Sequence, residues 1–355
     1  MVVLGVLVFF HELGHYLAAR WCGVHVEVFS IGFGATITEW TDRIGTRWKL
    51  SWLPLGGYVK LHGQERPEDV TDEVRASWIP GKTFHDKSVG ARALVVAAGP
   101  IANFILAAVL FAGLFIGVGK PITQSVVGEV MADGAAARGG MQAEDRILAI
   151  GAEKTKTFED IQRIVVAHPG ERFVVKVARA DKEVDLTVTI GTRDANGRPV
   201  GQLGIRGGKV VYEPVGLVDA VVGGVTQTWT VTTETFSGIG QMISGSRGSD
   251  ELGGPLRIAQ MSGKVAQLGI ASLISFIAVL SVNLGLINLF PIPVLDGGHL
   301  LFYAFEALRG RPLPPKAQEY GYRAGLAALA TLFIFATWND LSSFGLFRWV
   351  VGLIG

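Results

Sequence analysis

Long apolar stretches alternate with polar ones along the chain. Residues 93–119 and 265–295 carry no charged side chain over 27 and 31 positions. A membrane-spanning helix needs roughly 20 mostly apolar residues, so each stretch predicts one span. Residues 1–21 and about 320–339 predict one further span each. The pattern therefore predicts a polytopic α-helical membrane protein with about four transmembrane helices.

The first apolar stretch has two interpretations. A cleavable signal peptide would begin with basic residues and end at a small-residue cleavage site, and residues 1–21 show neither. The stretch also carries His11, Glu12 and His15 in its apolar part. A discarded segment has no use for these side chains, so we expect a retained helix.

The polar regions predict two folded parts. Alternation over 24–28, 36–40 and 47–52 predicts strands within the loop 22–92. They form either an ordinary surface sheet or a membrane-associated β region whose edge pairs with an extended peptide. Residues 120–210 predict a small α/β domain, and 211–264 an amphipathic linker along the membrane surface. The remaining predicted segments are helix 1–21, helix 93–119, helix 265–298, loop 299–319, and a helix with a tail over 320–355.

Basic residues in short loops predict the orientation. Arg309, Arg311, Lys316 and Arg323 cluster between the last two apolar stretches, so we expect that loop on the cytoplasmic side. Residues 22–92 then lie on the same side, and 120–264 and both termini lie outside.

Composition narrows the class of protein. The net charge is +1, which argues against a nucleic-acid partner. Only 18% of residues are charged and the mean hydropathy is +0.38, as expected if part of the chain lies in lipid. Cys22 is the only cysteine, which excludes an intrachain disulfide and zinc sites that need two or more cysteines.

The sequence His11-Glu12-Leu13-Gly14-His15 is the strongest chemical signal. On a helix, positions i and i+4 share a face, so both imidazoles can bind one Zn²⁺. Glu12 stands beside them and can take a proton from water. Ionisable groups cost about 2.5–3.5 kcal/mol each inside a membrane, so three within five residues favour function over packing.

A catalytic zinc usually has three protein ligands, so one more is expected. Asp296 is the best candidate, because it follows an uncharged run that Pro291 and Pro293 break. Broken backbone at membrane depth occurs where it lines a polar cavity. The expected orientation also places Asp296 at the depth of the two histidines, whereas the rival ligand His299 lies closer to the cytoplasmic loop.

These motifs resemble the site-2 protease family of intramembrane zinc metalloproteases, in particular the regulator-of-sigma-E protease type. The resemblance extends to Ala98–Phe104, Pro54–Lys60, Gly253–Pro255 and the segment from Asn288 through Pro291 and Pro293 to Gly297. Residues 140–151 resemble bacterial PDZ domains, with Glu144 where that family often has glycine. The resemblance implies zinc ligands His11, His15 and Asp296, the catalytic base Glu12, and substrate contacts at Asn288, Gly32, Gly34, Gly56, Gly57, Pro291 and Pro293.

The function implied is cleavage of transmembrane segments of single-pass membrane proteins, such as a pretrimmed anti-sigma factor, in a bacterial cytoplasmic membrane. The PDZ-like domain would face the periplasm, as a size gate, as a peptide-binding module or as a spacer. Clearance of remnant signal peptides is an alternative substrate class. A zinc-holding scaffold, a metal transporter and a PDZ adaptor are alternatives of another kind. A transporter needs polar groups along a path through the bilayer, whereas here they cluster at one depth.

Overall fold

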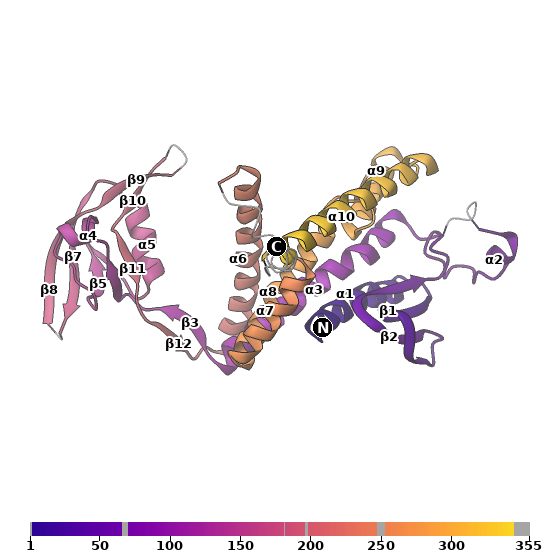
Figure 1. The fold of residues 1–355 in the computed structure, drawn as a ribbon, viewed down its shortest axis with the longest axis horizontal. Coiled ribbons are helices and arrows are strands. Elements are labelled where there is room, and N and C mark those ends of the chain that lie inside the picture. The colour runs from indigo at the N-terminus through magenta and orange to yellow at the C-terminus, as the bar shows by residue number, and fades with distance from the viewer. Residues whose placement is uncertain (1, 66–69, 181, 196–197, 247–252, 344–355) are drawn as a thin grey trace, which may run out of the picture. The chain divides into compact units, whose positions relative to one another are not determined.

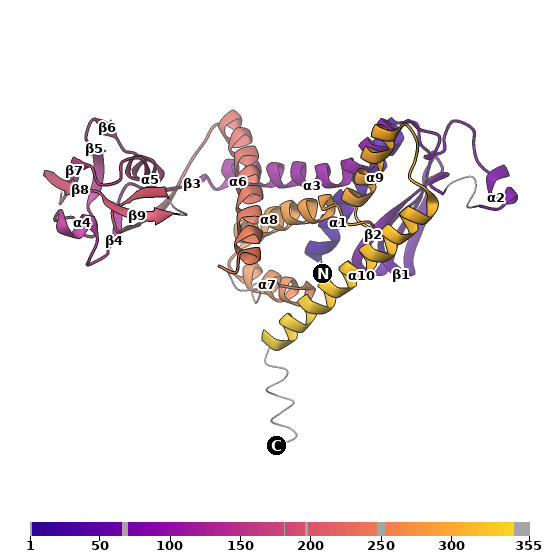
Figure 2. The ribbon, with the colours of Figure 1, turned by 90° about the horizontal axis from the view of Figure 1, so that it is seen from above.

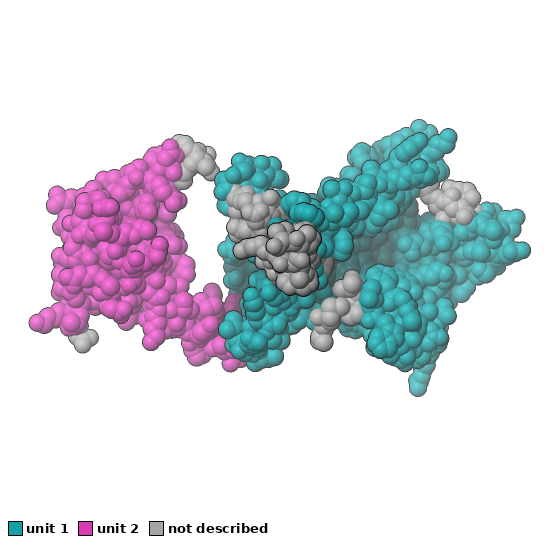
Figure 3. Space-filling view, in the orientation of Figure 1, with its two compact units in different colours: residues 1–114, 218–355 teal, residues 115–217 magenta. Residues whose placement is uncertain are grey.

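The computed structural model describes residues 2–65, 70–180, 182–195, 198–246 and 253–343. The chain forms two compact units, unit 1 with residues 1–114 and 218–355 and unit 2 with residues 115–217 (Figure 3). Unit 2 covers the segment for which a small domain over 120–210 was predicted. The end of the predicted C-terminal tail, from residue 344 on, lies outside the described residues.

Unit 1 consists of helices and one β-hairpin, and α1 is at its centre (Figures 1 and 2). One core lies where Leu7 of α1 meets Leu106 and apolar side chains of residues 273–284. Another lies where Ala19 and Tyr16 pack on Phe29 of the hairpin. The elements of unit 1 are α1 (Val2–Trp21), β1 (Val26–Thr41), β2 (Arg47–Leu61), α2 (Asp72–Ala76), α3 (Val89–Gly117), α6 (Leu217–Ile243), α7 (Pro255–Gln267), α8 (Ile270–Leu289), α9 (Asp296–Arg309) and α10 (Pro315–Ser343).

Three helices among the described residues are long and apolar enough to cross a membrane, namely α3, α8 and α10. They confirm a polytopic helical membrane protein. Helix α1, the other predicted span, is not among these three. Its His11, Glu12, His15 and Arg20 lower the hydropathy of its described part.

The structure corrects one predicted segment and adds detail to another. The helix expected over 265–298 is interrupted at Gly269, which adopts φ +106° between α7 and α8. The chain also leaves α8 at Leu289, just before the proline break that the sequence predicts. Pro291 and Pro293 lack the N–H that a continuing helix needs, so Asp296 begins the separate helix α9. The linker expected over 211–264 contains a continuous helix of 27 residues, α6, and the first turns of α7.

The hairpin of β1 and β2 curls on itself (Figure 1). Residues 28–31 of β1 pair with 57–60 on one side and with 47–50 on the other, and 47–51 also pair with 36–41. The segment 57–61 therefore has a strand partner on one side, and its other edge pairs with no strand among the described residues. The hairpin packs against α1, which brings this edge next to the helix that carries the two histidines.

Unit 2 is an α/β domain around one apolar core. Its four-stranded antiparallel sheet has the order β6-β5-β7-β8, and Ile161, Ile164 and Val165 of α5 pack with the sheet residues Ile147 and Val177. A capping box of Thr157 and Asp160 begins α5. The elements are β3 (Lys120–Thr123), β4 (Val127–Val130), α4 (Ala135–Arg138), β5 (Arg146–Ile150), β6 (Glu153–Lys154), α5 (Phe158–Ala167), β7 (Arg172–Arg179), β8 (Lys182–Thr189), β9 (Gly191–Ala195), β10 (Arg198–Gln202), β11 (Ile205–Gly207) and β12 (Val210–Glu213).

Candidate metal centre

Helix α1 places His11 and His15 on one face, one turn apart. Their rings meet edge to face at a centroid distance of 4.8 Å, and the two Nε2 atoms lie 3.3 Å apart. The sequence spacing predicted this juxtaposition. His15 Nδ1 lies 2.9 Å from the main-chain oxygen of Val95, so Nδ1–H donates to that carbonyl, and in the neutral ring Nε2 carries the lone pair.

Helices α1 and α3 pack closely, and glycines at their contact leave room for the imidazoles. A Cβ on Gly14 would lie 2.2 Å from the oxygen of Ala98, and a Cβ on Gly99 would lie 2.3 Å from His15 Nε2. Both positions therefore require glycine. Val95, Gly99 and Asn103 are spaced by four, so one face of α3 lies along the two histidines.

Asp296 reaches the same point from α9. It is the first residue of that helix, where the helix dipole favours a carboxylate. The preceding turn is tight, since a Cβ on Gly297 would lie 2.3 Å from the oxygens of Leu289 and Phe290. Val294 adopts φ +113°, a strained value for a β-branched residue that the surrounding packing must hold. At its other end α9 is joined to α3 by the mostly buried ion pair Arg92–Glu306, at 2.6 Å.

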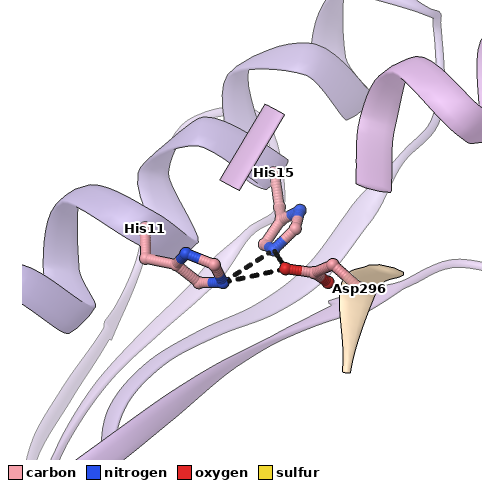
Figure 4. Close-up of side chains that lie close together, drawn as sticks. All are labelled: His11, His15 and Asp296. Atoms are coloured by element: carbon pink, nitrogen blue, oxygen red, sulfur yellow. Dashed lines mark hydrogen bonds and ion pairs between the residues drawn. The ribbon is translucent and has the colours of Figure 1, made fainter. Parts of the chain in front are cut away.

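The three side chains converge as metal ligands do (Figure 4). Asp296 Oδ2 lies 3.1 Å from His11 Nε2 and 3.5 Å from His15 Nε2, and the imidazoles point from α1 toward the carboxylate. No hydrogen bond of adequate geometry reaches this buried oxygen. Zinc bonds to nitrogen and carboxylate oxygen are about 2.0–2.2 Å long, so a tetrahedral site has edges of about 3.4 Å. The three donor–donor distances, 3.1, 3.3 and 3.5 Å, fit one face of such a tetrahedron.

Glu12 and the ligands line one polar cavity of about 520 Å³. Glu12 is 9% exposed and belongs to the helix turn between the histidines. The hairpin edge forms part of the wall through Gly57, Tyr58 and Val59, and Asn288 lies at another part of it. The cavity therefore joins the donor set, a carboxylate and an unpaired strand edge.

The other predicted substrate contacts lie elsewhere. Gly56 faces the ring of Phe33, and Gly32 faces the oxygens of Ser51 and Leu53 across the hairpin. Gly34 has open space where a Cβ would stand. Pro291 lines a separate apolar cavity, and Pro293 lies so close to α10 that a Cβ on Gly325 would overlap its main-chain oxygen. Of the predicted substrate contacts, the structure brings Asn288 and Gly57 to the cavity with the ligands.

His299, the rival ligand, lines the same cavity one turn after Asp296. Its Nδ1 lies 3.4 Å from the hydroxyl of Tyr322. The donor cluster within 4.8 Å in the described part of the chain comprises His11, His15 and Asp296 and does not include it. The geometry therefore favours Asp296 as the third ligand.

Two residues of the site were missed by sequence reasoning, Gly99 and Asn103. Gly99 leaves room for the imidazoles, and Asn103 lies 3.0 Å from His11 Nδ1 through its Nδ2. One signal was available: Asn103 is the only residue with a polar side chain in the run 93–119. A lone amide in an apolar helix indicates a specific partner.

A helical membrane protein with two histidines and one aspartate converging beside a glutamate has the donor set of a metallopeptidase. The chain belongs to peptidase family M50, whose model matches residues 1–332. It is 46% identical over 360 residues to "Putative zinc metalloprotease Atu1380" of Agrobacterium fabrum, covering 97% of this chain and 94% of that protein. It is 38% identical to "Metalloprotease MmpA" of Caulobacter vibrioides over 99% of this chain and 97% of that protein. It is 32% identical to "Zinc metalloprotease RasP" of Geobacillus kaustophilus over 97% of each chain. The predicted family and the predicted metalloprotease class are confirmed.

Proposed function

We propose that this protein is an intramembrane zinc endopeptidase that cleaves the transmembrane segments of single-pass membrane proteins. One observation carries the proposal: two imidazole nitrogens and a carboxylate oxygen lie 3.1–3.5 Å apart beside Glu12, in a unit that contains three helices apolar enough to span a membrane. His11, His15 and Asp296 would hold Zn²⁺. Zinc in such a site supplies Lewis-acid activation of water and of the peptide carbonyl.

Glu12 is the proposed general base. Its carboxylate accepts the proton of the attacking water and then donates that proton to the nitrogen of the departing amine. Because Glu12 is buried, few bulk water molecules can compete for its hydrogen bonds. Its place on α1, beside His11 and His15, fixes its distance from the ligands.

The hairpin edge is the proposed substrate-binding element. A helical substrate hides its carbonyls in internal hydrogen bonds, so the segment has to unwind before it is cut. The edge of residues 57–61 can pair with an extended peptide, and Gly57 brings that edge to Glu12. Asn288, near the end of α8, would bind the substrate backbone from another part of the cavity wall. Pro291, Pro293, Gly32, Gly34 and Gly56 would act by shaping these elements.

The hairpin surface supports a location at the membrane. Phe33, Ile37, Trp40, Trp52 and Leu53 are exposed, with Trp52 at 70%. Aromatic side chains favour the interface between lipid and water. We place the β region there, as the second interpretation of the sequence predicted.

The proposed topology follows from the basic loop between α9 and α10. Because Arg309, Arg311 and Lys316 make that loop basic, we propose that it lies in the cytoplasm of a bacterium, with the active site toward that side of the inner membrane. Unit 2, which follows α3 in the chain, then lies in the periplasm. We propose that it is a PDZ-like domain that limits access to substrates whose outer domain another protease has removed, such as anti-sigma factors. Its sheet with a packed α5 supports this assignment.

The test is cleavage of a pretrimmed single-pass model substrate by the detergent-purified protein, with the cut mapped by mass spectrometry. We compare wild type, wild type with a zinc chelator, Glu12→Gln, and Glu171→Gln as a matched control on the surface of unit 2. We expect a cut inside the transmembrane segment in wild type and Glu171→Gln. We expect none with chelator or in Glu12→Gln. A cut outside the membrane segment, or full activity of Glu12→Gln, would contradict the proposal. A remnant signal peptide tested beside the model substrate separates the two substrate classes.

A further inference from the structure

Asn103 of α3 is buried with 0% exposure and makes its side-chain contact with a metal ligand. Its Nδ2 lies 3.0 Å from His11 Nδ1. The other polar atom of the amide, Oδ1, is buried and has no hydrogen-bond partner. Among the described residues, two buried side-chain polar atoms have no hydrogen-bond partner, Oδ1 of Asn103 and Oδ2 of Asp296. Both belong to one site, and a buried amide oxygen without a donor is costly.

The chemistry of a neutral imidazole connects these observations. One ring nitrogen carries the proton and the other carries the lone pair. His11 turns Nε2 toward Asp296 and His15, so a metal held there takes the Nε2 lone pair. The proton of His11 then resides on Nδ1, which needs an acceptor. Nδ2 of Asn103 is a donor and cannot serve, whereas Oδ1 can.

A rotation of the amide by 180° exchanges Oδ1 and Nδ2 and leaves the rest of the side chain in place. It brings Oδ1 to the proton of His11 Nδ1 and satisfies the orphaned oxygen. We infer that Asn103 is a positioning residue whose amide oxygen accepts the Nδ1–H of His11 in the metal-bound protein and so fixes the tautomer that binds metal. This inference rests on the proposed zinc site.

The neighbouring histidine provides the comparison. The Nδ1–H of His15 donates to the main-chain oxygen of Val95, at 2.9 Å, and this hydrogen bond fixes the tautomer of His15 in the same way. Val95 and Asn103 stand two turns apart on α3, on either side of Gly99. One face of α3 therefore orients both ligands, by a backbone carbonyl for His15 and by a side chain for His11. Such outer partners are typically worth 10–100-fold in metal affinity.

The experiment measures zinc affinity of the full-length protein in detergent by competition with a chromophoric chelator. Asn103→Leu has similar volume and no acceptor, whereas Asn103→Asp offers only oxygens. Asn103→Ala serves if leucine prevents folding. Ser281→Ala is the matched control, because Ser281 Oγ donates to the main-chain oxygen of Asn103 at 2.8 Å and does not involve the amide. The spectrum of the Co²⁺-loaded protein is a second readout that does not depend on cleavage.

We expect Asn103→Leu and Asn103→Ala to bind zinc 10–100-fold more weakly than wild type and to change the Co²⁺ spectrum. We expect Asn103→Asp and Ser281→Ala to stay within about threefold of wild type, well inside that range. Wild-type affinity in Asn103→Leu or Asn103→Ala would overturn the inference, and so would an Asn103→Asp protein as weak as Asn103→Leu. Failure of wild type itself to bind zinc would instead refute the proposed metal site, so the two failures are distinguishable.

Discussion

A Cβ atom on Gly99 would lie 2.3 Å from Nε2 of His15, well inside contact distance. The same atom would lie 2.9 Å from Cε1 of His11. Any side chain at this position therefore occupies the place of the ligand rings. The metal centre depends on a glycine of α3 as much as on the histidines of α1.

The first prediction concerns this glycine. Gly99→Ala pushes the imidazoles away from Asp296, so we expect zinc content to fall from about one per chain to well below half, with loss of cleavage. Gly113→Ala, on the same helix with open space at the Cβ position, is the matched control. Zinc measured by plasma mass spectrometry checks this. Equal zinc in the two variants would contradict the close packing of α3 on His15.

The second prediction concerns the ion pair that joins α3 to α9. Arg92 and Glu306 approach to 2.6 Å with 16% and 14% exposure, and the Arg92 guanidinium also lies over the ring of Tyr303. Arg92→Met leaves Glu306 as an unpaired, mostly buried charge, so we expect a loss of about 3 kcal/mol in the free energy of unfolding.

Arg323 and Glu319 form the comparison, also at 2.6 Å but 72% and 60% exposed. We expect Arg323→Met to change stability by no more than about 0.5 kcal/mol. Denaturation in detergent, followed by circular dichroism, measures both. If the two variants lose similar amounts of unfolding free energy, burial does not explain the contribution of the Arg92–Glu306 pair.

The third prediction is a pH dependence of unit 2. The Asp145 side chain is fully buried, and burial by itself raises the pKa of its carboxyl. The Arg179 guanidinium at 2.7 Å and the N–H of Gln142 outweigh burial and hold that pKa below its usual value. A pKa lowered by folding contributes stability above the unfolded-state pKa, about 3.9, and that stability is lost as the pH falls through the folded value.

We therefore expect unit 2 to lose stability as the pH falls below about 4, and Arg179→Met to be destabilised already at pH 7 and to vary less with pH. Calorimetry of the full chain from pH 3 to 7 tests this. Arg206→Met, which breaks an exposed pair with Glu129, is the control and should follow wild type. An unchanged pH profile in Arg179→Met would count against the argument.

The fourth prediction separates substrate binding from metal binding. A Cβ on Gly57 would lie 2.7 Å from the oxygen of Ser30 and 3.0 Å from Cγ of Glu12. We expect Gly57→Ala to lower cleavage of the model substrate at least tenfold while one zinc remains bound, because the crowding affects the strand edge and the base and leaves the ligands in place. Gly90→Ala, with open space at its Cβ position, should cleave normally. Loss of zinc in Gly57→Ala would refute this separation.

Much of the site can be predicted from the sequence, because its main residues are related by short spacings along the chain or by their unusual place in apolar segments. The i, i+4 spacing fixes His11 and His15 on one helix face, and the rule on ionisable groups in membranes then directs attention to Asp296. The contacts of Gly99 and Asn103 depend on how α3 packs against α1. The lone amide of Asn103 stands out in the sequence, but its partner His11 does not follow from any local pattern. The strand pattern predicted the hairpin in outline, but the double pairing of residues 28–31 depends on register shifts along β1.

The helical segments show the same limit. The run 265–295 is apolar throughout, so hydropathy does not reveal the break at Gly269. Glycine occurs in apolar helices and also at positions of positive φ, and the sequence does not distinguish the two cases. The linker over 211–264 is predicted as an amphipathic segment along the membrane surface, and its many threonines do not indicate one continuous helix. In α6 these hydroxyls donate to carbonyls one turn back, as Thr228 does to Gly224 and Thr232 to Thr228, so their hydrogen bonds are made within the helix.

Zinc stoichiometry in Asp296→Asn and His299→Asn, compared with wild type, tests the identity of the third metal ligand. The two residues lie one turn apart on α9 and line the same cavity, and only Asp296 belongs to the donor cluster. We expect one zinc per chain in wild type and His299→Asn, and a loss of most zinc in Asp296→Asn. Retained zinc in Asp296→Asn together with its loss in His299→Asn would show that His11, His15 and Asp296 do not form the metal site.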